Sequence, residues 1–201
     1  MRLLAEEHTL RFLNMNNASE LIDSLWKAGD NLKIFHDRLK REIDGRSPAI
    51  AGIIGRELLL RARTLSSSEF AIAAYLASEG EAGNDSLEDF IDCVSILPFD
   101  RYLKITNDHE ALADDPVRTE FEEFGFYKIF ENRFESIFGE EGDGLLSHLV
   151  FGDITLRPQG DANLDPKSLF PQLFERFGMC FVRKPAKESF SEKATLDDFF
   201  G

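Results

Sequence analysis

Histidine and carboxylate side chains stand next to each other at two places in the sequence, His36-Asp37 and Asp108-His109. Such pairs could ligate a transition metal ion. His109-Glu110 begins like the zinc-binding motif His-Glu-x-x-His, but Ala113 stands where the second histidine would be. The 4 histidines fall in different segments, so no local spacing supports a ligand set. We therefore expect no metal ion and no cofactor, and a metal-dependent hydrolase is kept only as an alternative function.

The usual arrangements for covalent and acid–base catalysis are also missing. The sequence contains no Gly-x-Ser-x-Gly motif, and neither Cys93 nor Cys180 lies in a motif that would activate a thiol. Paired acids such as Glu140-Glu141 are adjacent, and adjacent side chains diverge around a helix instead of converging on a substrate. The sequence therefore favours a non-enzymatic protein.

One aromatic side chain within an acidic stretch suits contact with a protein partner. Phe126 is surplus to the expected core and lies on the face beside Glu122 and Glu123. Aromatic residues anchor protein interfaces, and surrounding acids set their charge complementarity. We therefore expect Glu122, Glu123 and Phe126 to contribute to partner binding.

The C-terminal tail holds a second candidate for partner binding. Leu196, Phe199 and Phe200 have the spacing that places three apolar side chains on one side of a helical turn. This pattern resembles the clamp-binding peptide of archaeal and eukaryotic replication proteins, in which glutamine usually stands at the position of Lys193. The resemblance implies a replication-associated protein that binds a sliding clamp. Alternatively, the two phenylalanines fold back onto the parent domain.

The negative charge is concentrated in the middle of the sequence. The net charge of the chain is −14, and residues 79–165 alone carry 22 acidic and 6 basic side chains, whereas residues 1–78 and 166–201 each carry +1. Such a field attracts cationic partners and repels phosphate, so we expect a basic protein partner and no direct contact with nucleic acid. The alternative is a solvated surface without a partner. The expected contiguous negative surface includes Glu81, Asp89, Asp92, Glu120, Glu123 and Glu131.

Most of the sequence shows the signals that predict α-helices, and these helices must position the side chains named above. Apolar residues recur at spacings of three and four, and caps or cap–proline pairs precede them. These helix starts are expected at Asn17, Ser47, Ser66, Asp85, Asp115 and Asp165. Only the short runs 153–156 and 179–182 favour strands. We predict an all-α fold over residues 1–185, a compact bundle of six to eight helices with at most a minor β-hairpin, and a polar tail over residues 186–201.

Periodicity along these helices also predicts the core. The apolar positions on the inward faces are Leu25, Trp26, Phe35, Leu39, Ile54, Leu58, Ala74, Leu87, Phe90, Val94, Phe130, Phe134, Leu169 and Leu173. No apolar run approaches the roughly 20 residues that cross a bilayer, and the first residues lack the apolar centre of a signal peptide. We therefore expect a cytoplasmic protein without membrane contact.

One stretch resembles a known family. The stretch begins with a predicted helix that contains Ala73-Ala74-Tyr75-Leu76. A linker with Gly80 and Gly83 follows. The next predicted helix has an acidic start, Asp85-Ser86-Leu87-Glu88-Asp89-Phe90. With the short acidic segment 108–113, it resembles the bacterial family called domain of unknown function 4240 over about residues 19–138. The resemblance implies a helical fold and no established activity. The expected function is a binding or regulatory protein, and an immunity-type inhibitor of a basic nuclease toxin is its most specific form.

Overall fold

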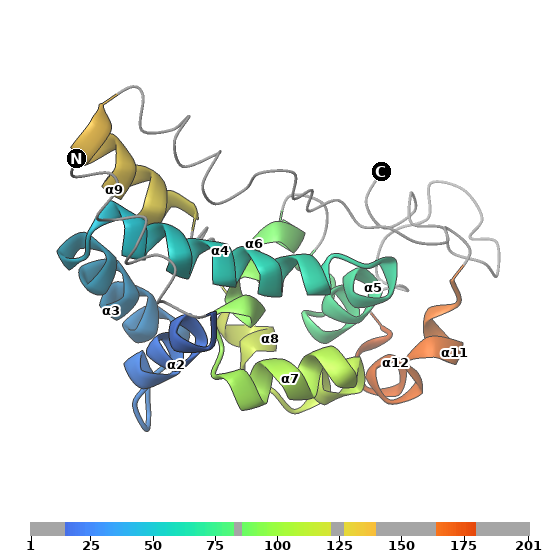
Figure 1. Ribbon diagram of the computed structural model, residues 1–201. Helices are drawn as coiled ribbons and strands as arrows, with labels where there is room; N and C mark the ends of the chain where they lie inside the picture. Colours follow the sequence, from blue (N-terminus) through green and yellow to red (C-terminus); the bar gives the residue numbers. More distant parts are fainter. Residues whose placement is uncertain (1–14, 83–85, 122–126, 140–163, 180–201) are drawn as a thin grey trace.

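The computed structural model describes residues 15–82, 86–121, 127–139 and 164–179, and every regular element in these ranges is helical (Figure 1). The prediction of an all-α fold is therefore confirmed. The elements in chain order are α2 (Met15–Leu25), α3 (Leu32–Gly45), α4 (Pro48–Leu65), α5 (Ser68–Ala77), α6 (Leu87–Ser95), α7 (Phe99–Asn107), the 3-10 helix η2 (His109–Ala113), α8 (Val117–Glu120), α9 (Tyr127–Phe138), α11 (Pro166–Leu169) and α12 (Pro171–Phe177). Two of these α-helices, α8 and α11, have only 4 residues each.

Helix α4 forms the centre of the arrangement. It begins as the sequence predicts, because Ser47 accepts a hydrogen bond from the Ile50 N–H and Pro48 occupies the first turn. Its buried face packs against α2, α6 and α9. In Figure 1 α2 and α3 lie at one end of α4, and α5, α11 and α12 lie toward the other end.

A single hydrophobic cluster joins the described helices. Most of the predicted core residues are buried in it, and the exceptions are Leu25, Trp26 and Leu169, which are half-buried and pack against its edge. Trp26 stacks on Phe35 with ring centroids 4.3 Å apart, and its indole N–H donates to the Ile96 carbonyl at 2.8 Å. Because its polar edge has a partner, the indole can lie at the rim of the core.

Two predicted helices are interrupted. The helix expected to start at Asp115 ends after α8, because Phe121 is extended with ψ 137°, and α9 is a separate helix. The helix expected from Asp165 breaks at Phe170, which has φ −131° and ψ 68°. Pro171 explains this second break, since a proline disfavours helical backbone in the residue before it and starts a new helix readily.

Three helix starts differ slightly from the prediction or lie partly outside the described residues. Helix α6 has Ser86 as its N-cap, without a side-chain capping hydrogen bond, and the predicted cap residue Asp85 is not described. The side chain of Ser67, not that of Ser66, caps α5 by accepting the Phe70 N–H at 3.0 Å. Helix α2 already includes Met15 and therefore begins before Asn17.

Several sequence predictions lie outside the described residues. They include the strand-favouring run 153–156, residues 180–182 of the second run, the domain end at 185 and the tail 186–201. Among the described helices, none is both long enough and apolar enough to cross a membrane.

Candidate functional site

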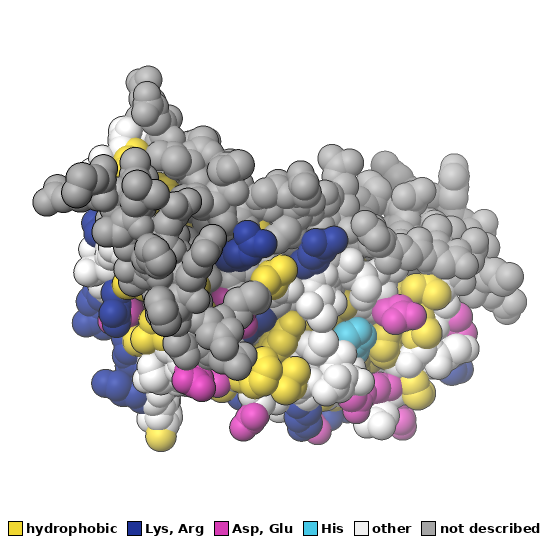
Figure 2. Space-filling model, viewed as in Figure 1, with side chains coloured by type: hydrophobic (Ala, Val, Ile, Leu, Met, Phe, Trp, Pro, Cys, Tyr) yellow, Lys and Arg dark blue, Asp and Glu magenta, His cyan; other side chains and the backbone are white. Residues whose placement is uncertain are grey.

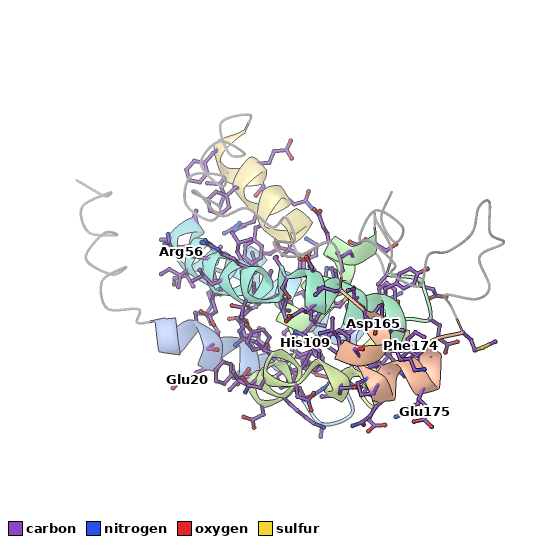
Figure 3. All side chains as sticks on the ribbon, turned by 90° about the vertical axis from the view of Figure 1, so that its right-hand side faces the viewer. Glu20, Arg56, His109, Asp165, Phe174 and Glu175 are labelled. Carbon is purple, nitrogen blue, oxygen red and sulfur yellow. The ribbon has the colours of Figure 1, made fainter. Side chains whose placement is uncertain are left out.

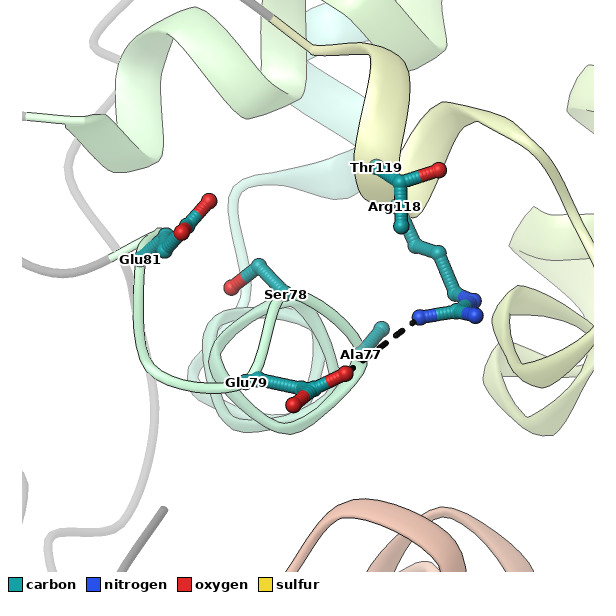
Figure 4. Close-up of a pocket in the computed structure, with 6 residues that line it drawn as sticks. All are labelled: Ala77, Ser78, Glu79, Glu81, Arg118 and Thr119. Atoms are coloured by element: carbon teal, nitrogen blue, oxygen red, sulfur yellow. Dashed lines mark ion pairs between the residues drawn. The ribbon is translucent and has the colours of Figure 1, made fainter. Parts of the chain in front are cut away.

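An open pocket of about 280 Å³ lies between the C-terminal end of α5 and helix α8 (Figure 4). Its lining is mostly polar and consists of Ala77, Ser78, Glu79, Glu81, Arg118 and Thr119. We call it the acidic pocket, since its lining includes two carboxylates and a single guanidinium group. Its charged lining residues all belong to the acid-rich segment 79–165.

The Glu79 carboxylate reaches the acidic pocket because α5 ends in a Schellman motif at this residue. The Gly80 N–H donates to the Tyr75 carbonyl at 2.8 Å, and the Glu79 N–H donates to the Leu76 carbonyl at 3.0 Å. Glu79 has φ +56° and thus occupies the left-handed position that usually holds glycine. Left-handed backbone costs a residue with a side chain roughly 1–2 kcal/mol. The helix end therefore carries strain that glycine would avoid.

Replacing Glu79 with glycine is expected to stabilise the protein. Glu79→Gly removes the left-handed strain but increases the freedom of the unfolded chain, so the free energy of unfolding should rise by about 0.5–1 kcal/mol. Urea denaturation followed by circular dichroism measures this change. Glu81→Gly is the matched control, because Glu81 is exposed and its φ is not positive, and it should not stabilise. Equal effects of the two substitutions would contradict the assignment of strain to Glu79.

Arg118 connects the acidic pocket to the C-terminal helices. Its guanidinium nitrogen lies 3.7 Å from a Glu79 carboxylate oxygen, which is close enough for an ion pair but too long for a hydrogen bond. The same guanidinium lies 4.7 Å from the ring centroid of Phe177 in α12. It also lies near Asp114, whose pKa is held below its usual value chiefly by the hydrogen-bonded Arg176 and to a smaller extent by Arg118. Arg118 thus has partners on two sides.

Further exposed carboxylates lie on helices α6 and α8. Glu81 and Glu120 are exposed, and Glu120 follows the lining residue Thr119 directly. The Phe90 and Phe121 rings meet at 5.0 Å and hold the end of α8 against α6, where Glu88 is exposed in the first turn. Among the described residues, no ion pair involves Glu81, Glu88 or Glu120. We call these three residues the acidic rim.

The wider distribution of charge is uneven. Lys and Arg side chains gather over α3, whereas many Asp and Glu side chains lie over α7 and α12 (Figure 2). Of the six acids expected to form one negative surface, Glu81 lines the acidic pocket and Glu120 is exposed at the end of α8. Asp89 and Asp92 are half-buried on α6. The side chains of Glu123 and Glu131 lie outside the described part.

The residues named as possible metal ligands lie in two places, because His36 and Asp37 belong to α3, whereas His109 and Glu110 belong to η2 and contact the C-terminal helices. His109 lies beside α11 and α12 (Figure 3), and its ring contacts those of Phe70 and Phe170 at 5.3 and 6.0 Å. Both carboxylate oxygens of Glu110 accept N–H groups from the first turn of α12, at 3.0 and 2.8 Å. Among the residues that the structure describes, no group of three or more His, Cys, Asp and Glu side chains could hold a metal ion. The capping role of Glu110 is not evident from the sequence.

The sequence predicts partner-binding residues at other positions of the chain. Glu122, Glu123, Phe126, Leu196, Phe199 and Phe200 all lie outside the described residues. Cys93 is buried in α6. The sequence does not predict the acidic pocket as a site, although it predicts a negative surface that includes the lining residue Glu81.

No family model, no curated protein and no solved structure matches this chain. The resemblance to the domain of unknown function 4240 family therefore stays a prediction, and the function rests on the geometry of the site.

Proposed function

We propose that this protein is a non-enzymatic binding protein that engages a basic protein partner through the acidic pocket and the acidic rim. The observation that carries the proposal is Glu79, which a strained helix end presents to an open pocket. Strained backbone is retained at functional sites more often than elsewhere, because a structural role alone would be filled better by glycine.

A lysine or arginine side chain of the partner is the group that suits this pocket. The Glu79 carboxylate is 59% exposed, and Arg118 pairs with it without a hydrogen bond. An incoming ammonium or guanidinium group could therefore donate the charge-assisted hydrogen bonds that Arg118 does not make. Glu81, on the other side of the pocket, offers a second acceptor (Figure 4).

The acidic rim extends the attraction beyond a single side chain. Glu88 and Glu120 are exposed and add negative charge on α6 and α8. Clustered charge of one sign accelerates encounters with a partner of opposite charge and disfavours acidic competitors. A protein that covers a basic nuclease, as an immunity-type inhibitor does, is the most specific form of the proposal.

Binding of a fluorescently labelled arginine-rich peptide tests this function. We expect the double variant Glu81→Gln/Glu120→Gln to bind the peptide about five-fold or more weakly than the unchanged protein, because two carboxylates of the site lose their charge. Affinity should also fall between about 50 and about 200 mM salt, since salt screens exposed charges. Fluorescence anisotropy measures both effects.

The matched control removes the same charge elsewhere. Glu20→Gln/Glu135→Gln neutralises two exposed carboxylates on α2 and α9. Its affinity for the peptide should change far less than that of the double variant at the acidic pocket. If both double variants lose the same affinity, the peptide senses only net charge and the proposed site is wrong.

A further inference from the structure

We infer that Arg118 is an internal cation that occupies the acidic pocket in the free protein and is displaced when the partner's basic side chain enters. This inference rests on the proposed function and concerns the regulation of the same site. It makes Arg118 an autoinhibitory residue, because a partner must compete with it for the Glu79 carboxylate.

The geometry of the Glu79–Arg118 pair suits an exchangeable contact. The two charged groups are 3.7 Å apart, and their side chains are 59% and 25% exposed. Exposed ion pairs without hydrogen bonds contribute little stability. A partner's guanidinium that donates hydrogen bonds to Glu79 would replace a weak contact with a stronger one.

Arg118 also has other partners besides Glu79. Its guanidinium already lies over the Phe177 ring at 4.7 Å, and its charge contributes to the lowered pKa of Asp114. An arginine displaced from Glu79 therefore keeps an aromatic face and a carboxylate nearby and is not left as an isolated cation. The alternative partners reduce the cost of displacement.

A double-mutant cycle with the labelled arginine-rich peptide tests the inference. Arg118→Gln should bind the peptide about two- to five-fold more tightly than the unchanged protein, because the internal competitor is gone. This gain should disappear when Glu79→Gln is also present, since the competition acts through Glu79. Arg118→Lys should restore the original affinity, because lysine keeps the positive charge.

Arg101→Gln is the matched control for net charge. Arg101 lies on α7 and is also partly exposed, but its guanidinium group pairs with the Asp115 carboxylate at 2.6 Å. Arg101→Gln should raise the affinity for the peptide less than Arg118→Gln does. Equal gains from the two variants, or an Arg118→Gln gain that persists with Glu79→Gln, would overturn the inference.

A spectroscopic readout on the unchanged protein separates the two proposals. The side-chain Nε–H resonance of Arg118 should shift as the peptide is added, because the guanidinium changes partners. If the peptide binds with the expected dependence on Glu81 and Glu120 while Arg118 is unaffected, this inference fails and the proposed function stands. If the peptide does not bind, the proposed function fails, and with it the competition that depends on it.

Discussion

Replacing Arg61 with methionine is expected to lower the free energy of unfolding by about 3–5 kcal/mol. Arg61 is only 3% exposed, and its guanidinium donates to the Leu97 carbonyl at 3.1 Å and pairs with Glu57 at 3.2 Å. It also lies 5.3 Å from the ring centroids of Phe99 and Tyr102. The Glu57 side chain is only 12% exposed. In Arg61→Met its carboxylate would stay largely buried and would lose the cation that pairs with it. Chemical denaturation monitored by circular dichroism measures the loss.

Arg56→Met is the matched control for this substitution. Arg56 lies on the same helix, α4, but is exposed, so its replacement should change the free energy of unfolding by less than about 0.5 kcal/mol. If Arg56→Met and Arg61→Met lower the free energy of unfolding by similar amounts, the buried contacts of Arg61 do not stabilise the protein.

Phe90→Ala is expected to have an effect of similar size, about 3–5 kcal/mol, on the free energy of unfolding. The Phe90 side chain is fully buried, and its ring contacts those of Phe70 at 6.2 Å and Phe121 at 5.0 Å. Alanine would leave a cavity between α5, α6 and the end of α8. Thermal or chemical denaturation measures the loss.

Phe138→Ala provides the comparison for Phe90→Ala. Phe138 lies at the end of α9 and is 40% exposed, so less apolar surface returns to water when it is truncated. We expect its loss to be under about 1.5 kcal/mol. If Phe138→Ala costs as much as Phe90→Ala, the difference in burial between the two rings does not determine their contributions to stability.

Much of the helical architecture can be predicted from the sequence because its signals are local. A cap and the amide that it satisfies lie within a few residues of each other, as Ser47 and Ile50 do at the start of α4. The same holds for Asp165, which accepts the Lys167 N–H at 3.2 Å at the start of α11. Periodicity likewise identifies buried positions such as Phe35 and Val94.

The acidic pocket could not be predicted in this way because its parts come from different segments. The charge count identifies the acid-rich region but does not show that α8 brings Arg118 to the end of α5. Glycine is the usual signal for a Schellman motif, and here Glu79 takes that position. The cap that Glu110 provides for α12 is hidden for the same reason, since it joins residues distant in sequence.

Titration of the ¹⁵N-labelled protein with the arginine-rich peptide, followed by NMR, tests the central claim most directly. The account predicts that the largest saturable amide shifts belong to residues at the acidic pocket and the acidic rim, namely Glu79, Glu81, Glu88, Arg118, Thr119 and Glu120. Exposed acids on α3, such as Asp37 and Asp44, serve as internal controls and should show little change. Shifts that spread evenly over all exposed acids, or that are largest on α3, would contradict the claim that this pocket binds a basic partner.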